Sequence, residues 1–237
     1  MKGLAVWLLR RHFNLASLGA ACLVTNGLLG RQAQAAASAE ASSGLRTPKP
    51  VAQRVVLVVG DSLSAEYGLK RGTGWVPLLQ AKLQAERPGT VLVNASVSGD
   101  TTSGGRNRLP ALLRQHQPTV VVIELGGNDA LRGLDLLHTQ ENLTSMVRSA
   151  KAAGAAVLLL GMDMPPNYGE QYARSFRELY PKVVKAERIA GVPFFLAGVA
   201  DVPDAQQWFQ ADRIHPNERA QPTMLANVWP ELSKLIR

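Results

Sequence analysis

Short, unbroken runs of apolar residues recur along the chain from residue 54 onwards. They are rich in Val, Ile and Leu, which is typical of strands buried on both faces of a parallel sheet. The third run is apolar except for Glu124. We therefore predict strands at residues 55–59, 90–94, 120–125, 156–160 and 192–196.

In the segments between these runs, apolar residues recur at the spacing of a helix. Trp75, Leu78, Leu79 and Leu83 recur at helical intervals, and Pro88-Gly89 ends that segment. Further helices are predicted around residues 109–113 with Pro110 near the helix start, over 142–153, up to about 190, and over 218–236. The alternation of strands and helices predicts a three-layer α/β/α sandwich with a mostly parallel, flavodoxin-like sheet of five strands. Residues 54–237 form one domain in this interpretation.

Residues 1–35 have the pattern of an export signal peptide. Lys2, Arg10 and Arg11 give it a basic start, and Ala33-Gln34-Ala35 offers a cleavage site of small residues. The two consecutive arginines also resemble a twin-arginine signal, so that Sec and Tat export both stay open. We expect a periplasmic or secreted protein.

The segment that follows, residues 36–53, is rich in Ala, Ser and Pro and is predicted to be a flexible lead-in. The apolar part of the signal, residues 15–29, is too short and interrupted for a comfortable membrane span, so we expect no stable membrane insertion of the mature domain. An anchor retained through the apolar residues 4–9 is the alternative.

Composition narrows the function only slightly. The net charge is +8, but the basic residues of the body are scattered and match no nucleic-acid-binding motif, so we expect no nucleic-acid partner. The one cysteine, Cys22, falls in the N-terminal segment. With few histidines and no phosphate-binding glycine motif, we expect no metal site and no cofactor.

Polar motifs follow three of the predicted strands. Gly60-Asp61-Ser62-Leu63 comes after the first strand, Ser98-Gly99-Asp100 after the second and Gly126-Gly127-Asn128-Asp129 after the third. Asp212-Arg213-Ile214-His215 precedes the last helix. The carboxyl ends of parallel strands meet at one edge of a sheet, where such folds bind ligands, so these four motifs are expected to converge.

These four blocks match, in order and kind, those of the SGNH (GDSL) hydrolases. The blocks and their surroundings, which include Arg108-Leu109-Pro110-Ala111-Leu112-Leu113 and Pro166-Asn167-Tyr168-Gly169, resemble the bacterial thioesterase I / protease I / lysophospholipase L1 (arylesterase) subgroup over roughly residues 54–237. The resemblance implies a serine hydrolase of acyl esters and thioesters. The substrates that the resemblance implies are small-molecule or lipid acyl esters.

The resemblance also implies a role for each block. Ser62 is the nucleophile, His215 the base and Asp212 the carboxylate that orients the imidazole. The oxyanion hole comprises the backbone N–H groups of Ser62 and Gly99 and the side-chain amide of Asn128. The residue types suit these roles, because a serine needs a base whose ordinary pKa lies near neutrality.

The acyl-binding residues are expected among Leu131, Leu134, Pro166 and Tyr168. Leu131 and Leu134, with Leu136 and Leu137, either line an acyl groove or form the core face of a helix, and the sequence leaves both readings open.

Two other functions stay open. A carbohydrate O-deacetylase uses the same fold and blocks, and activity limited to acetyl groups would support it. A non-catalytic, flavodoxin-like binding module is the alternative from another class. It fits poorly with the presence of Ser62, Asp212 and His215 together.

For the oligomeric state, we expect a monomer.

Overall fold

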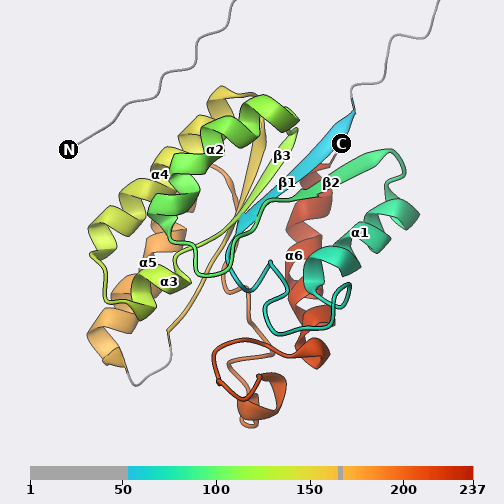
Figure 1. Ribbon diagram of the computed structural model, residues 1–237. Helices are drawn as coiled ribbons and strands as arrows, with labels where there is room; N and C mark the ends of the chain where they lie inside the picture. The colour runs from blue at the N-terminus through green and yellow to red at the C-terminus, as the bar shows by residue number, and fades with distance from the viewer. Residues whose placement is uncertain (1–52, 165–167, 237) are drawn as a thin grey trace, which may run out of the picture. The chain divides into compact units, whose positions relative to one another are not determined.

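The computed structural model describes residues 53–164 and 168–236. A five-stranded sheet forms its centre (Figure 1). The strands are β1 (Arg54–Gly60), β2 (Thr90–Asn94), β3 (Val120–Glu124), β4 (Ala156–Leu160) and β5 (Ala190–Val192). The predicted export signal and all of the lead-in before residue 53 lie outside the described residues, as does Pro166.

All neighbouring strands are parallel, and their order is β2-β1-β3-β4-β5. This is the flavodoxin-like order, in which the chain changes direction across the sheet between β1 and β3. Ligands bind such folds outside the carboxyl ends of those two strands. The predicted fold class is confirmed, and its topology brings Ser62 and Asn128 to that point of the sheet.

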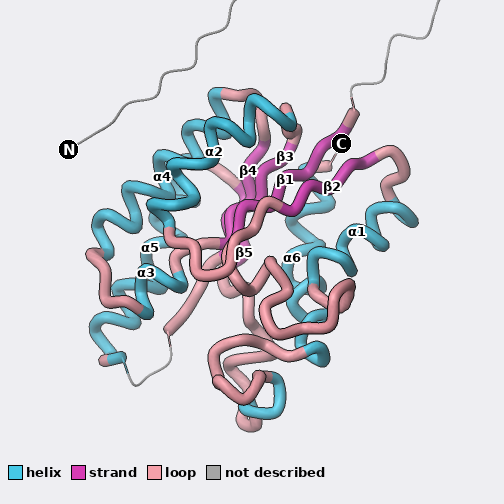
Figure 2. The backbone as a smooth tube through the Cα atoms, viewed as in Figure 1, coloured by secondary structure: helices cyan, strands magenta, loops and turns pink. Residues whose placement is uncertain are grey.

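Helices cover both faces of the sheet (Figure 2). On one face lie α1 (Trp75–Glu86) and α6 (Gln221–Leu235), and on the other α2 (Thr102–His116), α4 (Leu136–Ala152) and α5 (Glu170–Glu187). The short helices are α3 (Gly127–Leu131) and the 3₁₀ turns η2 (Ala205–Trp208) and η3 (Glu218–Ala220).

This two-sided cover explains why the strand sequences are apolar without alternation. Val56, Leu57 and Val58 are consecutive in β1 and all fully buried, and the whole of β3 is buried as well. Both faces of a parallel strand contact helices, so both sets of side chains leave water. The sheet is therefore a rigid base for the loops at its carboxyl edge.

The structure differs from the sequence predictions in three places. β5 spans Ala190–Val192 and not residues 192–196, because the pairing with β4 shifts after Val192: the next N–H to reach the Gly161 carbonyl is that of Phe195, at 2.8 Å, and not that of residue 194. Pro110 lies inside α2 and not near its start. It is exposed, as is Arg106 one turn earlier, so water can solvate the carbonyl that the proline leaves without a partner. The short α3 was not predicted.

Within residues 53–164 and 168–236, no helix combines the length and the apolar character needed to cross a membrane.

Candidate active site

Ser62 lies in a tight turn directly after β1. The Asp61 carboxylate accepts the Leu63 N–H at 3.0 Å, and the Asp61 carbonyl accepts the Ala65 N–H at 3.0 Å. The residue before the turn must be glycine, because a Cβ on Gly60 would lie 2.6 Å from the Glu124 carboxyl. The turn thus holds Ser62 at the carboxyl edge of the sheet, with 9% of its surface exposed.

His215 reaches Ser62 from a loop 153 positions away in the sequence. Its Nε2 lies 2.8 Å from Ser62 Oγ, and its Nδ1 lies 2.6 Å from Asp212 Oδ2. The carboxylate can only accept, so Nδ1 carries the proton and Nε2 accepts the serine O–H. This tautomer leaves Nε2 ready to remove the hydroxyl proton.

Asp212 is fixed by the backbone of its own loop. Its Oδ1 accepts the N–H groups of Ile214 and His215, each at 3.0 Å. Desolvation acts to raise the pKa of Asp212, but these two N–H groups and the imidazole outweigh it and lower the pKa to about 2. Asp212 is therefore ionised at neutral pH and can stabilise an imidazolium on His215.

Asn128 presents its side-chain amide next to the serine turn. One Nδ2 hydrogen is donated to Asp61 Oδ2 at 2.9 Å. The amide has a second hydrogen. Ser62 N–H has no acceptor within the described residues. Two donors, one from the turn and one from α3, are thus available for an oxyanion.

Gly99 lies in the loop after β2. The Asp100 N–H closes a turn onto the Val97 carbonyl at 3.0 Å, and Gly99 has a φ of +78° within it, a conformation that glycine adopts without strain. The Val97 N–H donates to the Gly60 carbonyl at 3.0 Å and ties this loop to the serine turn. Gly99 is exposed at the rim and does not line the cavity described below.

Asp61 has an unusual environment for a carboxylate. Desolvation raises its pKa to about 6, although the Leu63 N–H and the Asn128 amide act in the opposite direction. Its two oxygens hold the serine turn and the Asn128 side chain, respectively. Asp61 thus connects the turn that carries Ser62 with the Asn128 side chain.

A large cavity opens beside Ser62 and His215. It has a volume of about 890 Å³ and runs from the ends of β1 and β3 to residues that follow β4 and β5. Apolar side chains supply much of its wall, among them Leu131, Met162, Met164, Phe194, Leu196 and Phe209. Asp163 and Arg177 are also in the wall and pair with each other at 2.8 Å.

Only one of the predicted acyl-binding residues that the structure describes lines the cavity. Leu131 lines the cavity beside Asn128. Leu134 and Tyr168 are 42% and 39% exposed and do not line it. Leu136 packs at the edge of the core, whereas Leu137 is exposed. The leucine segment is therefore neither a continuous groove nor a continuous core face.

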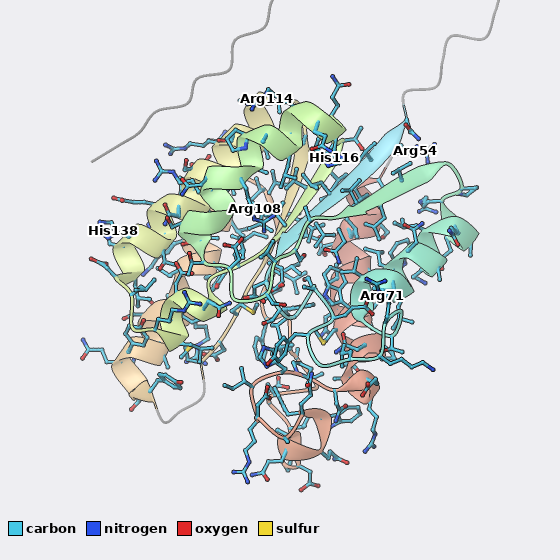
Figure 3. All side chains as sticks on the ribbon, viewed as in Figure 1. Arg54, Arg71, Arg108, Arg114, His116 and His138 are labelled. Carbon is cyan, nitrogen blue, oxygen red and sulfur yellow. The ribbon has the colours of Figure 1, made fainter. Side chains whose placement is uncertain are left out.

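The other described histidines lie away from this constellation. His116 is at the end of α2 and His138 near the start of α4 (Figure 3). The side chain of His138 is 74% exposed. Neither of them lines the cavity, whereas His215 does.

Sequence reasoning missed several residues that support the site. Arg108, near the sheet in Figure 3, donates to the carbonyls of Gly60 and Ala95 and pairs with Asp100 at 2.7 Å. Tyr67 packs on the His215 ring with centroids 4.4 Å apart. Glu124 accepts hydrogen bonds from the Asp61 N–H and the Ser64 hydroxyl. Its charge within an apolar strand could have indicated a special role, whereas nothing in the sequence pointed to Tyr67.

Comparison with known proteins agrees with this geometry. Residues 58–221 match the model of the GDSL-like lipase/acylhydrolase family. The chain belongs to this family. The chain is 53% identical to the esterase TesA of Pseudomonas aeruginosa over 185 residues, which cover 78% of this chain and 90% of that relative. For the thioesterase 1/protease 1/lysophospholipase L1 of Escherichia coli K12, identity is 43% and coverage 81% and 89%.

Solved structures of family members superpose on most of the chain. A crystal structure of TesA matches with a TM-score of 0.73 at 53% identity, over 77% of this chain and 99% of that one. The psychrotrophic esterase EstA from Pseudoalteromonas sp., inhibited by monoethylphosphonate, matches with a TM-score of 0.70 at 41% identity, over 76% and 97% of the chains. The prediction of an ester hydrolase of the SGNH (GDSL) class is confirmed.

Proposed function

We propose that the chain is an exported serine hydrolase that cleaves acyl esters and thioesters with Ser62, His215 and Asp212. The observation that carries the proposal is the continuous pair of contacts from Ser62 Oγ to His215 Nε2 and from His215 Nδ1 to Asp212, at 2.8 and 2.6 Å. The names of the relatives, esterase and thioesterase, support the same reaction class.

Acylation follows from these contacts. His215 Nε2 takes the Ser62 proton while Oγ attacks the substrate carbonyl carbon, and Asp212 stabilises the imidazolium. The carbonyl oxygen becomes an oxyanion that accepts hydrogen bonds from the Asn128 amide and the Ser62 and Gly99 N–H groups. The intermediate then expels the alcohol or thiol, which takes the proton from His215.

Deacylation repeats the sequence with water. His215 removes a proton from the water molecule as its oxygen attacks the acyl-enzyme carbonyl carbon. Collapse of the second tetrahedral intermediate breaks the bond to Ser62 Oγ, which regains its proton from His215. The carboxylic acid leaves, and the enzyme returns to its starting state.

The cavity suits an apolar acyl group. Leu, Met and Phe side chains supply much of its wall beside the Asp163–Arg177 pair, and its volume of about 890 Å³ far exceeds the needs of an acetyl group. These features favour medium or long acyl chains over the acetyl groups of a carbohydrate O-deacetylase. Export would place this activity in the periplasm or outside the cell, by way of residues 1–35.

The test is hydrolysis of p-nitrophenyl esters from acetyl to palmitoyl, with acyl-CoA beside them, by protein that begins near Ala36 and by its Ser62→Ala variant. We expect activity that extends to long chains and is lost in the variant. Activity confined to acetyl esters would favour the deacetylase. Unchanged hydrolysis by the variant, or failure of a fluorophosphonate to label Ser62, would overturn the mechanism.

A further inference from the structure

Trp75, the first residue of α1, uses both of its N–H groups in the protein interior. Its indole Nε1–H donates to Ser64 Oγ at 3.1 Å, and its backbone N–H donates to Gln221 Oε1 at 3.0 Å. The Trp75 side chain is fully buried. One residue thus contacts the serine turn through Ser64 and the start of α6 through Gln221.

On the α6 side, the contact continues to the loop of the base. Gln221 is 1% exposed, and its Nε2 donates to the Asn217 carbonyl at 3.1 Å and to the Pro216 carbonyl at 3.5 Å. Pro216 directly follows His215. Gln221 therefore holds the backbone next to the imidazole and the start of α1 at the same time.

On the β1 side, the contact ends on a buried carboxyl. Ser64 Oγ–H donates to Glu124 Oε2 at 2.6 Å, and the Asp61 N–H donates to the same oxygen at 3.2 Å. Glu124 is fully buried at the end of β3, and the second carboxyl oxygen, Oε1, has no partner within the described residues. These two bonds join β3 to the turn on both sides of Ser62.

Burying such a set of polar groups costs folding free energy, because each group exchanges its hydrogen bonds with water for one fixed partner. Apolar residues of similar size fill a core at lower cost, so a retained polar chain indicates a need for defined geometry. The residues between β1 and α1 include no helix or strand that could fix the turn independently. A displacement of about 1 Å in a catalytic group can lower the rate about a hundredfold.

We propose that Glu124, Ser64, Trp75 and Gln221 form a buried polar chain that positions the serine turn against the His215 loop and so fixes the Ser62–His215 contact. The inference rests on the proposed function, since it assigns these four as positioning residues for that reaction. None of them lines the cavity beside Ser62. Their effect is expected on the chemical step and not on substrate affinity.

A purely structural role is the competing explanation, and α6 offers a matched control. Asn227 on the same helix also has a side-chain amide that donates to two backbone carbonyls, those of Phe195 at 3.0 Å and Ala197 at 2.8 Å. Its partners follow β5, and neither belongs to the serine turn or to the loop of His215; the Phe195 ring packs on Trp75 with centroids 5.4 Å apart, but Asn227 holds only the Phe195 carbonyl. Gln221→Leu and Asn227→Leu each remove two amide-to-carbonyl bonds from one helix at different places, and Gln221→Leu also removes the acceptor of the Trp75 N–H.

The experiment compares these variants with Trp75→Phe, which removes the indole N–H and keeps the backbone N–H. The readouts are Tm, KM and kcat for p-nitrophenyl butyrate, and the rate of phosphorylation by diethyl p-nitrophenyl phosphate. We expect Gln221→Leu and Trp75→Phe to lower kcat and the phosphorylation rate about tenfold, with KM within about twofold. Asn227→Leu is expected to lower Tm to a similar extent and to leave the phosphorylation rate within about twofold.

Equal phosphorylation rates in Gln221→Leu and Asn227→Leu, or an unchanged rate in Trp75→Phe, would overturn the inference. If Gln221→Leu does not fold, Trp75→Phe against Asn227→Leu decides alone. Failure of the wild-type protein to react with the phosphate triester at Ser62 would instead remove the proposed function. A reactive wild type with unaffected variants removes only the positioning role.

Discussion

The Asn128 side chain donates to Asp61 Oδ2 at 2.9 Å, and this bond decides how the amide is oriented. With one hydrogen held by the carboxylate, the second projects along a direction fixed by the amide plane. Asp61 is itself fixed by the Leu63 N–H. The residue before Ser62 thus orients the Asn128 amide, a proposed oxyanion donor that comes from α3, after β3.

The first prediction concerns Asp61→Asn. The new amide would place an NH₂ group against either the Leu63 N–H or the Asn128 NH₂, so that one of the two bonds is lost. We expect kcat for p-nitrophenyl butyrate to fall by roughly ten- to a hundredfold, with little change in KM. Asn128→Ala should lower kcat by roughly 10²–10³.

The double variant tests the coupling of these two residues. If Asp61 acts through Asn128, Asp61→Asn should have little further effect in the Asn128→Ala background. Wild-type kcat in Asp61→Asn, or fully additive losses in the double variant, would contradict the orienting role.

Glu124→Gln is predicted to be tolerated, unlike Asp61→Asn. Desolvation and the nearby Asp61 raise the pKa of Glu124 well above its ordinary value, which favours the neutral acid, and one of its oxygens accepts two hydrogen bonds. A glutamine carbonyl can accept both bonds equally well. We expect kcat within about threefold of wild type for Glu124→Gln, and a loss of tenfold or more for Glu124→Ala.

The same substitution should change the pH dependence of stability. A carboxyl with a raised folded pKa binds more protons in the folded state, so its contribution is complete below the unfolded pKa, near 4.5, and is lost as pH rises towards the folded pKa. The free energy of unfolding of wild type relative to Glu124→Gln should therefore fall as pH rises above about 4.5. Urea unfolding at several pH values measures it, and a constant difference would show that Glu124 is not protonated.

Asp212→Asn tests the orientation of His215. Asparagine can donate an N–H towards Nδ1 and thereby favour the tautomer with its proton on Nε2, which cannot accept from Ser62. We expect kcat to fall by about 10³–10⁴, with a folded protein and nearly unchanged KM. A fall of less than tenfold would mean that Asp212 is not the orienting carboxylate.

The sequence predicted the sheet well because its strands are buried on both faces, and such runs stand out against the helical segments. It placed Ser62 and Asn128 at one edge of the sheet because parallel strands bring their carboxyl ends together, and it expected His215 in a loop at the same edge. Position along the chain, together with residue type, was enough for these side chains.

What the sequence did not reveal depends on contacts between distant segments. The buried side chains of Trp75 and Gln221 have the spacing of ordinary helix residues, and their shared hydrogen bond spans 146 positions. The β5 boundary depends on a shift of the pairing with β4 after Val192, which an apolar run does not reveal. The leucines after Asn128 lie across a turn and two helices, α3 and α4, so no single periodicity describes which of them faces the cavity.

The last prediction uses those leucines as a matched pair. Leu131 lines the cavity, whereas Leu134, three residues later, is 42% exposed outside it. In Leu131→Trp, the indole would occupy space that an extended acyl chain needs and an acetyl group does not. We therefore expect kcat/KM for p-nitrophenyl palmitate to fall roughly ten- to a hundredfold more than that for the acetate. Leu134→Trp should change both by less than about twofold. Equal losses on both esters in Leu131→Trp would instead indicate a disturbed Asn128, which lies in the same short helix, and similar behaviour of the two variants would place the acyl chain outside this cavity.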